Sequence, residues 1–168
     1  NGLGQARDAR LAILDLINQA IDDGAQIISI SQGTPVSDSE FQWALVRAMS
    51  EGVIVVASAG NTARDNSYAQ LIRWSGVVGV SAINSDGTFA SYSSWGNGVV
   101  TAAFGGPVNT VDANTGAPTT TSGTSNATAL VSGMLALARQ KWPDATANQI
   151  LQALTHTGLS PKHEWNKY

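Results

Sequence analysis

The chain has 168 residues, of which 43% are hydrophobic and 12% are charged, and its net charge is −3. This composition predicts a globular core in one domain or part of one, and the lack of a basic excess argues against binding to nucleic acid or to an anionic membrane. The absence of cysteine excludes disulfides and thiolate metal sites but leaves the cellular compartment open. The longest apolar run, near Gly52 to Ala57, is too short to span a bilayer. Because the chain begins at Asn1 without a methionine, we expect natural sequence upstream of it.

Helical and strand patterns alternate over the first half of the chain. Apolar residues at helical spacing are followed by Gly24 at the position of a C-cap glycine, and the later apolar runs are short and nearly continuous. Such runs are typical of strands that are covered on both faces. The expected elements are a helix through Leu11 to Ile21, a strand at 27–31, a helix at 39–52, and strands at 53–57 and 77–80. This order predicts an α/β fold with a mostly parallel sheet flanked by helices.

The second half begins with a segment rich in Ser, Gly, Thr and Asn, at 81–121, which we expect to form hairpins and loops. A long helix is predicted from about Ser125 to Trp142. The last helix opens with a capping box at 146–149 and ends before Gly158.

Polar residues follow two of the predicted strands and open the long helix. The carboxyl ends of parallel strands meet at one edge of a sheet, so these residues should line a common crevice. Ser125, at the start of a helix, would have its backbone N–H directed outward, where the helix dipole favours negative charge. Asn61 would add a side-chain amide donor, which suits the stabilisation of a developing oxyanion.

Four segments resemble motifs of the subtilisin-like (subtilase) serine peptidases, and they occur in the family's order and approximate spacing. The segments are Ile28-Ser29-Ile30-Ser31-Gln32-Gly33 (family form I-N-M-S-x-G), Val55-Val56-Ala57-Ser58-Ala59-Gly60-Asn61 (A-A-G-N), Phe89-Ala90-Ser91-Tyr92-Ser93-Ser94-Trp95-Gly96 (A-S-F-S-x-x-G) and Ser122-Gly123-Thr124-Ser125-Asn126-Ala127-Thr128 (G-T-S-x-A). With the neighbouring helices they cover nearly the whole chain. The resemblance implies a three-layer subtilisin-like fold, incomplete here, with residues 1–168 as part of one peptidase domain.

The resemblance also implies a role for each matched residue. Ser125 would be the nucleophile that forms the acyl-enzyme, and Asn61 would donate its amide to the oxyanion beside the Ser125 backbone N–H. The substrate would be an extended peptide or protein that pairs with one edge and enters a pocket with small walls. The implied substrate-binding residues are Ser31, Gln32, Gly33, Ala57, Ser58, Ala59 and Gly60.

The chain departs from the family pattern in one important respect, because the catalytic aspartate and histidine precede the serine in this family. The two histidines, His156 and His163, both follow Ser125, and no segment resembles the family's His-Gly-Thr motif. We therefore expect the general base and its carboxylate upstream of Asn1, and we expect the isolated chain to be inactive or nearly so.

Two other classes of function are consistent with parts of the sequence. A non-catalytic relative could keep the fold as a scaffold or binding module, although it would need neither Ser125 nor Asn61. A nucleotide-binding α/β domain is disfavoured because Gly2-Leu3-Gly4 is an incomplete phosphate loop. No cofactor is expected, structural calcium is left open, and an extracellular or cell-envelope location is expected from the resemblance.

Overall fold

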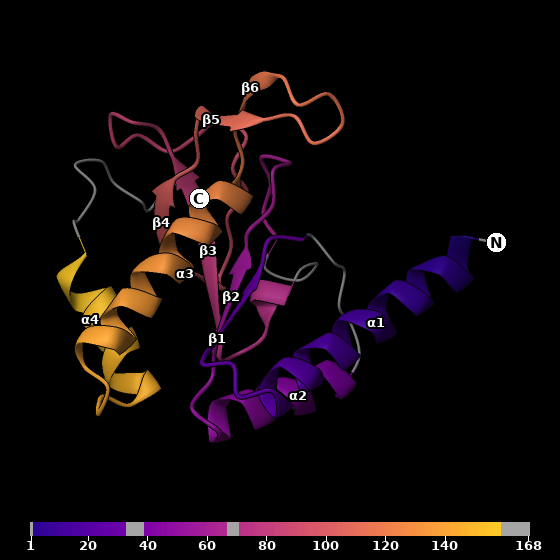
Figure 1. Ribbon diagram of the computed structural model, residues 1–168, viewed down its shortest axis with the longest axis vertical. Helices are drawn as coiled ribbons and strands as arrows, with labels where there is room; N and C mark the ends of the chain where they lie inside the picture. The colour runs from indigo at the N-terminus through magenta and orange to yellow at the C-terminus, as the bar shows by residue number, and fades with distance from the viewer. Residues whose placement is uncertain (1, 33–38, 67–70, 159–168) are drawn as a thin grey trace.

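The computed structural model describes residues 2–32, 39–66 and 71–158, with side chains from residue 12 onward in those ranges. A parallel sheet of four strands lies between two layers of helices (Figure 1). The elements in chain order are α1 (Gly2–Asp22), β1 (Ile27–Ile30), α2 (Ser39–Ser50), β2 (Ile54–Ser58), the short 3-10 helix η1 (Leu71–Arg73), β3 (Val77–Ile83), β4 (Val99–Phe104), β5 (Val108–Val111), β6 (Pro118–Thr121), α3 (Thr124–Lys141) and α4 (Ala147–Thr157).

The main sheet has the strand order β1-β2-β3-β4, and every neighbouring pair is parallel. All of β2 is buried, because helices cover both faces of the sheet. Ile54 and Val56 pack into a core with α3 and α4, whereas Val55 and Ala57 pack into a second core with α1 and α2. The α/β fold with a parallel sheet flanked by helices is therefore confirmed.

One strand of the main sheet was not expected. β4 lies within the segment predicted to form hairpins and loops, and it pairs in parallel with β3. That prediction is wrong for 99–104 and right for the antiparallel β5–β6 hairpin that follows. The half-exposed β4 is short and surrounded by Gly-, Ser- and Asn-rich sequence, so its apolar pattern is weak.

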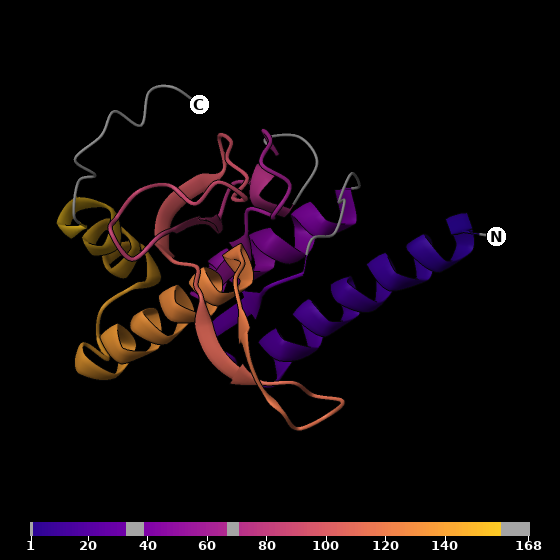
Figure 2. The same cartoon turned by 90° about the horizontal axis from the view of Figure 1, so that it is seen from above.

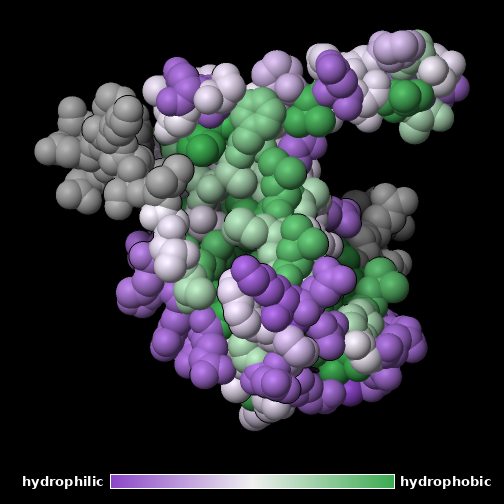
Figure 3. All heavy atoms as spheres, turned by 60° about the vertical axis from the view of Figure 1, so that its left-hand side comes forward, coloured by the Kyte–Doolittle hydropathy of each residue, from purple (hydrophilic) through white to green (hydrophobic). Residues whose placement is uncertain are grey.

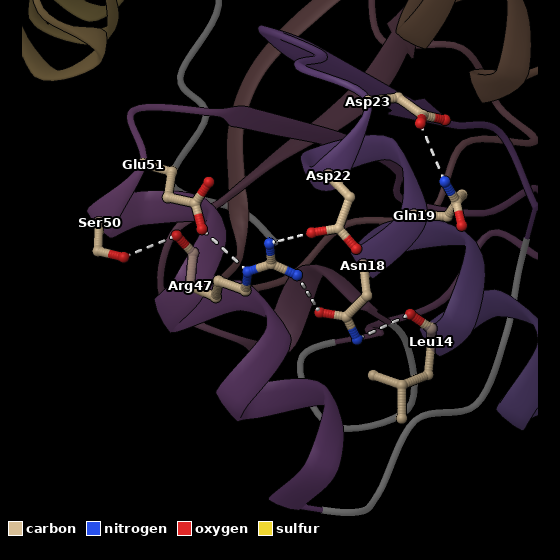
Figure 4. Close-up of polar contacts among 8 residues, drawn as sticks. All are labelled: Leu14, Asn18, Gln19, Asp22, Asp23, Arg47, Ser50 and Glu51. Atoms are coloured by element: carbon tan, nitrogen blue, oxygen red, sulfur yellow. Dashed lines mark hydrogen bonds and ion pairs between the residues drawn. The ribbon is translucent and has the colours of Figure 1, made fainter.

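The helices α1 and α2 are joined by a polar network on their outer surface (Figure 4). The Arg47 guanidinium donates to Asp22 at 2.5 Å, to Glu51 at 2.9 Å and to the side-chain oxygen of Asn18 at 3.2 Å. These partners raise the pKa of Arg47, with Asp22 as the largest cause. The network fixes α2 against the C-terminal half of α1.

The β5–β6 hairpin extends away from the two helical layers (Figure 2). Its register runs from the pair Val108 and Thr121 to the pair Val111 and Pro118 at the tip. Within the described part of the chain, no helix has the length and apolar character needed to cross a membrane.

Candidate active site

Three segments that are distant in the sequence meet at the carboxyl-terminal edge of the main sheet. Ser31 follows β1, Asn61 follows β2, and Ser125 lies in the first turn of α3. Hydrogen bonds connect the first segment to the third and the second to the third. Open α/β sheets hold their ligands at this edge.

Ser125 and Ser31 exchange two hydrogen bonds. The Ser125 hydroxyl donates to the Ser31 carbonyl oxygen at 3.0 Å, and the Ser31 hydroxyl donates to the Ser125 carbonyl oxygen at 3.2 Å. Ser125 is partly exposed and Ser31 is exposed, so the hydroxyl of Ser125 lies at the surface. A peptide carbonyl oxygen is only weakly basic, so Ser31 orients this hydroxyl without activating it.

Asn61 is hydrogen-bonded to the residue that precedes Ser125. Its side-chain oxygen accepts from the Thr124 backbone N–H at 2.8 Å and from the Thr124 hydroxyl at 2.9 Å. Because the oxygen of the amide faces Thr124, its NH₂ group is the end left to donate. That nitrogen lies beside Gly123, where an added Cβ atom would come within 3.0 Å of it.

The turn that carries Asn61 is held by buried polar side chains. Gly60 has a φ of 102°, which allows the chain to leave β2 sharply, and its carbonyl accepts from the Ser94 N–H at 2.8 Å. The buried Asn66 amide donates to the Ala59 carbonyl at 2.6 Å. These contacts anchor the segment that bears the Asn61 amide.

The turn before Ser125 is anchored in the same way. The Gly123 N–H donates to the Gly105 carbonyl at 2.8 Å, and the Asn126 amide donates to the same carbonyl at 3.1 Å. The Tyr92 hydroxyl lies behind this turn, and an added Cβ atom on Gly105 would come within 2.4 Å of it. Burial raises the pKa of Tyr92, and the nearby Gly123 backbone opposes that shift.

The residues predicted to bind substrate fall into three groups. Ser31 and Gln32 are exposed at the end of β1, and Gly33 lies outside the described residues. Ala57, Ser58 and Ala59 are buried. Ala57 and Ala59 belong to the core with α1 and α2. Any contact of 57–59 with a ligand would therefore come from the backbone.

The histidine within the described residues is remote from this chemistry. His156 is exposed near the end of α4, where its Nδ1 atom lies 2.8 Å from the Gln152 carbonyl oxygen. His163 lies outside the described residues. In the described ranges, no three His, Cys, Asp or Glu side chains are grouped as metal ligands would be, so no role for calcium is derived.

Thr124 is the site residue whose role was not predicted. Its side chain is fully buried and contacts both Asn61 and the Gly60 N–H. The only signal in the sequence was its place in the Gly-Thr-Ser segment, which does not reveal a contact with a residue 63 positions away.

A pocket of about 410 Å³ lies at the opposite edge of the sheet, between the ends of α1 and α2 and the start of α4. Arg139 lines it and donates to the Gly52 carbonyl oxygen at the end of α2. Since a cation at a helix C-terminus is stabilised by the dipole, Arg139 has a structural role there. This pocket is separate from the site around Ser125.

Comparison with known proteins assigns the chain to a family. The model of the Subtilase family matches residues 4–168, and the chain belongs to that family. The chain is 37% identical over 143 residues to the thermostable alkaline protease of Halalkalibacterium halodurans, covering 84% of this chain and 38% of that protein. It is 33% identical over 153 residues to Subtilisin DY of Bacillus licheniformis, covering 89% of this chain and 55% of that protein.

Solved structures agree with this assignment. A protease from Pseudoalteromonas arctica has a TM-score of 0.73 at 31% identity, over 82% of this chain and 45% of that one. Sphericase has a TM-score of 0.72 at 30% identity, over 89% of this chain and 54% of that one. The chain thus spans about half or less of the length of these relatives and has the fold of subtilisin-like proteases.

Proposed function

We propose that this chain provides the nucleophile and the oxyanion-binding half of a serine endopeptidase. Ser125 attacks the scissile carbonyl and becomes acylated, and water then releases the acyl group. The Asn61 amide and the Ser125 backbone N–H donate to the oxyanion. The observation that carries the proposal is the pair of hydrogen bonds from Thr124 to Asn61, which brings this amide next to the nucleophile turn.

The chemistry requires a base that the described residues do not supply. The Ser125 proton is donated to the Ser31 carbonyl, and His156 is hydrogen-bonded within α4. We infer that a histidine, oriented by an aspartate, comes from polypeptide other than the described residues, and that this chain alone is inactive.

The substrates are peptides or proteins bound in extended form. Ser31 and Gln32 are exposed where β1 ends, and Gly33 continues that segment, so a substrate strand can pair with its backbone. The backbone of 57–60 forms the facing wall of the pocket. An extracellular or cell-envelope location is part of the same proposal, and its support is the similarity to alkaline proteases and subtilisins.

The test uses the complete protease with a chromogenic peptide substrate. Ser125→Ala should abolish turnover, and Asn61→Ala should lower kcat; the corresponding loss in subtilisin, a member of this family, is roughly 10²–10³. Asn148→Ala is the matched control, because Asn148 is an exposed amide in the first turn of α4. The proposal fails if Asn61→Ala and Asn148→Ala have the same kcat.

A serine-directed fluorophosphonate probe separates catalysis from the alternative of a binding module. The complete protein should be labelled at Ser125, and the 168-residue chain alone should not. Absence of labelling at Ser125 in the complete, folded protein would favour the non-catalytic scaffold.

A further inference from the structure

The helix α3 has the composition of a buried helix but is half exposed. Between Ser125 and Ala138 it contains no charged residue. Leu130 is 52% exposed, Met134 is 49% exposed and Leu137 is 67% exposed. A helix that lacks charged residues around its whole circumference is normally covered on all sides. Figure 3 shows hydrophobic side chains gathered in a band on the side of the molecule that carries α3.

The exposed part of α3 lies next to an unpaired strand edge. At about 100° per residue, Ala129, Gly133 and Ala136 fall between the Leu130, Met134 and Leu137 stripe and the side of Ser132. We call these six residues, 129, 130, 133, 134, 136 and 137, the α3 face, and all six are exposed. The Ser132 hydroxyl donates to the Ser29 hydroxyl of β1 at 2.8 Å. β1 is the edge strand, paired with β2 alone in this sheet.

Both features need the same kind of occupant. An unpaired strand edge presents backbone donors and acceptors in a row, which another extended segment satisfies. The α3 face has small residues towards β1 and larger apolar ones farther away, so an uncharged, apolar layer of polypeptide can pack closely against it. A charged partner or an anionic surface would find no complementary charge on this face.

The relatives indicate which polypeptide this is. The matched regions make up 55% of Subtilisin DY and 38% of the thermostable alkaline protease, so both relatives contain substantial sequence with no counterpart in this chain. A second copy of this chain would leave those parts of the fold unaccounted for.

We propose that the α3 face and the free edge of β1 form one continuous interface, and that its occupant is the part of a subtilase domain that lies outside the matched region. This inference rests on the proposed function, since the occupant also brings the base to Ser125 from the side of Ser31. The interface makes the catalytic centre conditional: the chain folds around its own sheet, and Ser125 becomes reactive only when the interface is covered.

The experiment co-expresses the 168-residue chain with the unmatched part of Subtilisin DY as a separate polypeptide. Affinity purification measures binding, and hydrogen exchange measures the protection of the α3 and β1 amides. Binding should protect β1 amides and the amides of α3, while the β5–β6 hairpin stays unchanged. The unmatched part of the thermostable alkaline protease is a second probe, so that a single sequence mismatch does not decide the result.

A matched pair of variants tests the location of the interface. Leu137→Lys places a charge on the α3 face, and Leu16→Lys places one at a similarly exposed site on α1, where the exposed fractions are 67% and 66%. Leu137→Lys should lower co-purification by about tenfold or more, because an unpaired ammonium is costly to bury. Leu16→Lys should leave it unchanged. Both side chains are mostly exposed, so both variants should keep the wild-type melting temperature.

Several results would overturn the interface. These are failure of both probes to bind, equal effects of Leu137→Lys and Leu16→Lys, or a stable dimer of the chain alone that Leu137→Lys dissociates. Binding and α3 protection without fluorophosphonate labelling of Ser125 would contradict the proposed function but support the interface. Labelling of Ser125 in the uncovered chain would support a protease and contradict the interface's control of it.

Discussion

The orientation of the Asn61 amide depends on one threonine hydroxyl. Thr124 donates from this hydroxyl to the Asn61 oxygen at 2.9 Å and accepts from the Gly60 N–H at 3.2 Å. The oxygen and nitrogen ends of an amide have nearly the same shape, so hydrogen bonds decide which end faces outward. With its oxygen bound to Thr124, Asn61 turns its NH₂ group towards the place where an oxyanion would form.

Replacing Thr124 with valine should therefore impair catalysis in the complete protease without removing Asn61. Valine has a similar volume but no donor, so the amide keeps only the Thr124 backbone N–H and loses its fixed orientation. We expect kcat to fall about tenfold, less than on loss of Asn61, with little change in KM. The folded state should lose roughly 1 kcal/mol with one buried hydrogen bond.

Thr124→Ser is the control for this prediction, because it keeps the hydroxyl and removes only a methyl group. Steady-state kinetics of the two variants measure the difference. Equal kcat values for the serine and valine variants would show that the hydroxyl does not orient Asn61.

The residues of this site differ in how far the sequence predicts them. Ser125 and Asn61 follow from motifs, because the chemistry restricts the residue type at each position. The burial of Ala57 and Ala59 was not foreseen, since a strand covered on both faces turns its side chains alternately into two cores. The contact between Thr124 and Asn61 depends on tertiary folding, and no local pattern predicts it.

At the level of elements, close backbone packing determines where β4 can lie. Gly98 precedes β4, and a Cβ atom there would come within 1.6 Å of the Ile72 carbonyl oxygen. Gly133, in the middle of α3, has no atom within 4 Å of the corresponding position. The same substitution should therefore have opposite effects at these two glycines.

Gly98→Ala should destabilise the protein by more than about 3 kcal/mol, because the clash is with backbone that cannot rotate away. Gly133→Ala should stabilise the chain by roughly 0.5–1 kcal/mol, because alanine favours a helix interior. Urea unfolding followed by circular dichroism measures both changes. Similar unfolding midpoints for the two variants would contradict the packing of η1 against the start of β4.

The tip of the β5–β6 hairpin should respond to acid. Asp112 accepts from the N–H groups of Asn114 at 2.9 Å and Thr115 at 2.8 Å, and from the Thr115 hydroxyl at 3.0 Å. These bonds, with the Thr115 N–H first, lower the pKa of Asp112 below its ordinary value of 3.8. The folded state thus holds the proton more weakly than the unfolded state.

The stabilisation from Asp112 is therefore fully present above pH 3.8 and is lost as the pH falls through the lower pKa of the folded state. An NMR titration should show the Thr115 and Asn114 amide signals moving together with the Asp112 carboxyl. In Asp112→Asn this acid-dependent change should disappear. A titration of Asp112 at or above 3.8 would contradict these hydrogen bonds.

The sequence predicts elements best where their periodicity is long. The long helix was expected from about Ser125 and begins at Thr124, and the capping box at 146–149 is present with both of its hydrogen bonds. β4 was missed because its strand character comes from pairing with β3, across a register shift near Gly79, rather than from its own pattern. Pairing between distant segments is the information that a single chain pattern lacks.

Across the whole molecule, stability should be concentrated in the middle of the sheet. β2 and the first six residues of β3 are buried between the two cores, which lie on opposite faces of the sheet. The hairpin strand β6 is exposed at every position, and β5 is exposed everywhere except Val108. Opening the hairpin exposes little apolar surface, whereas opening β2 disrupts both cores at once.

Hydrogen exchange of the 168-residue chain in increasing urea should reflect this difference. The β2 and β3 amides should exchange only through global unfolding, so the free energy of their exchange should fall steeply with urea. The β5 and β6 amides should exchange through local opening that is nearly independent of urea, because little surface becomes exposed. Equal urea dependence in the hairpin and in β2 would mean that the hairpin unfolds together with the sheet, and its protrusion from the helical layers would then not make it an independent unit.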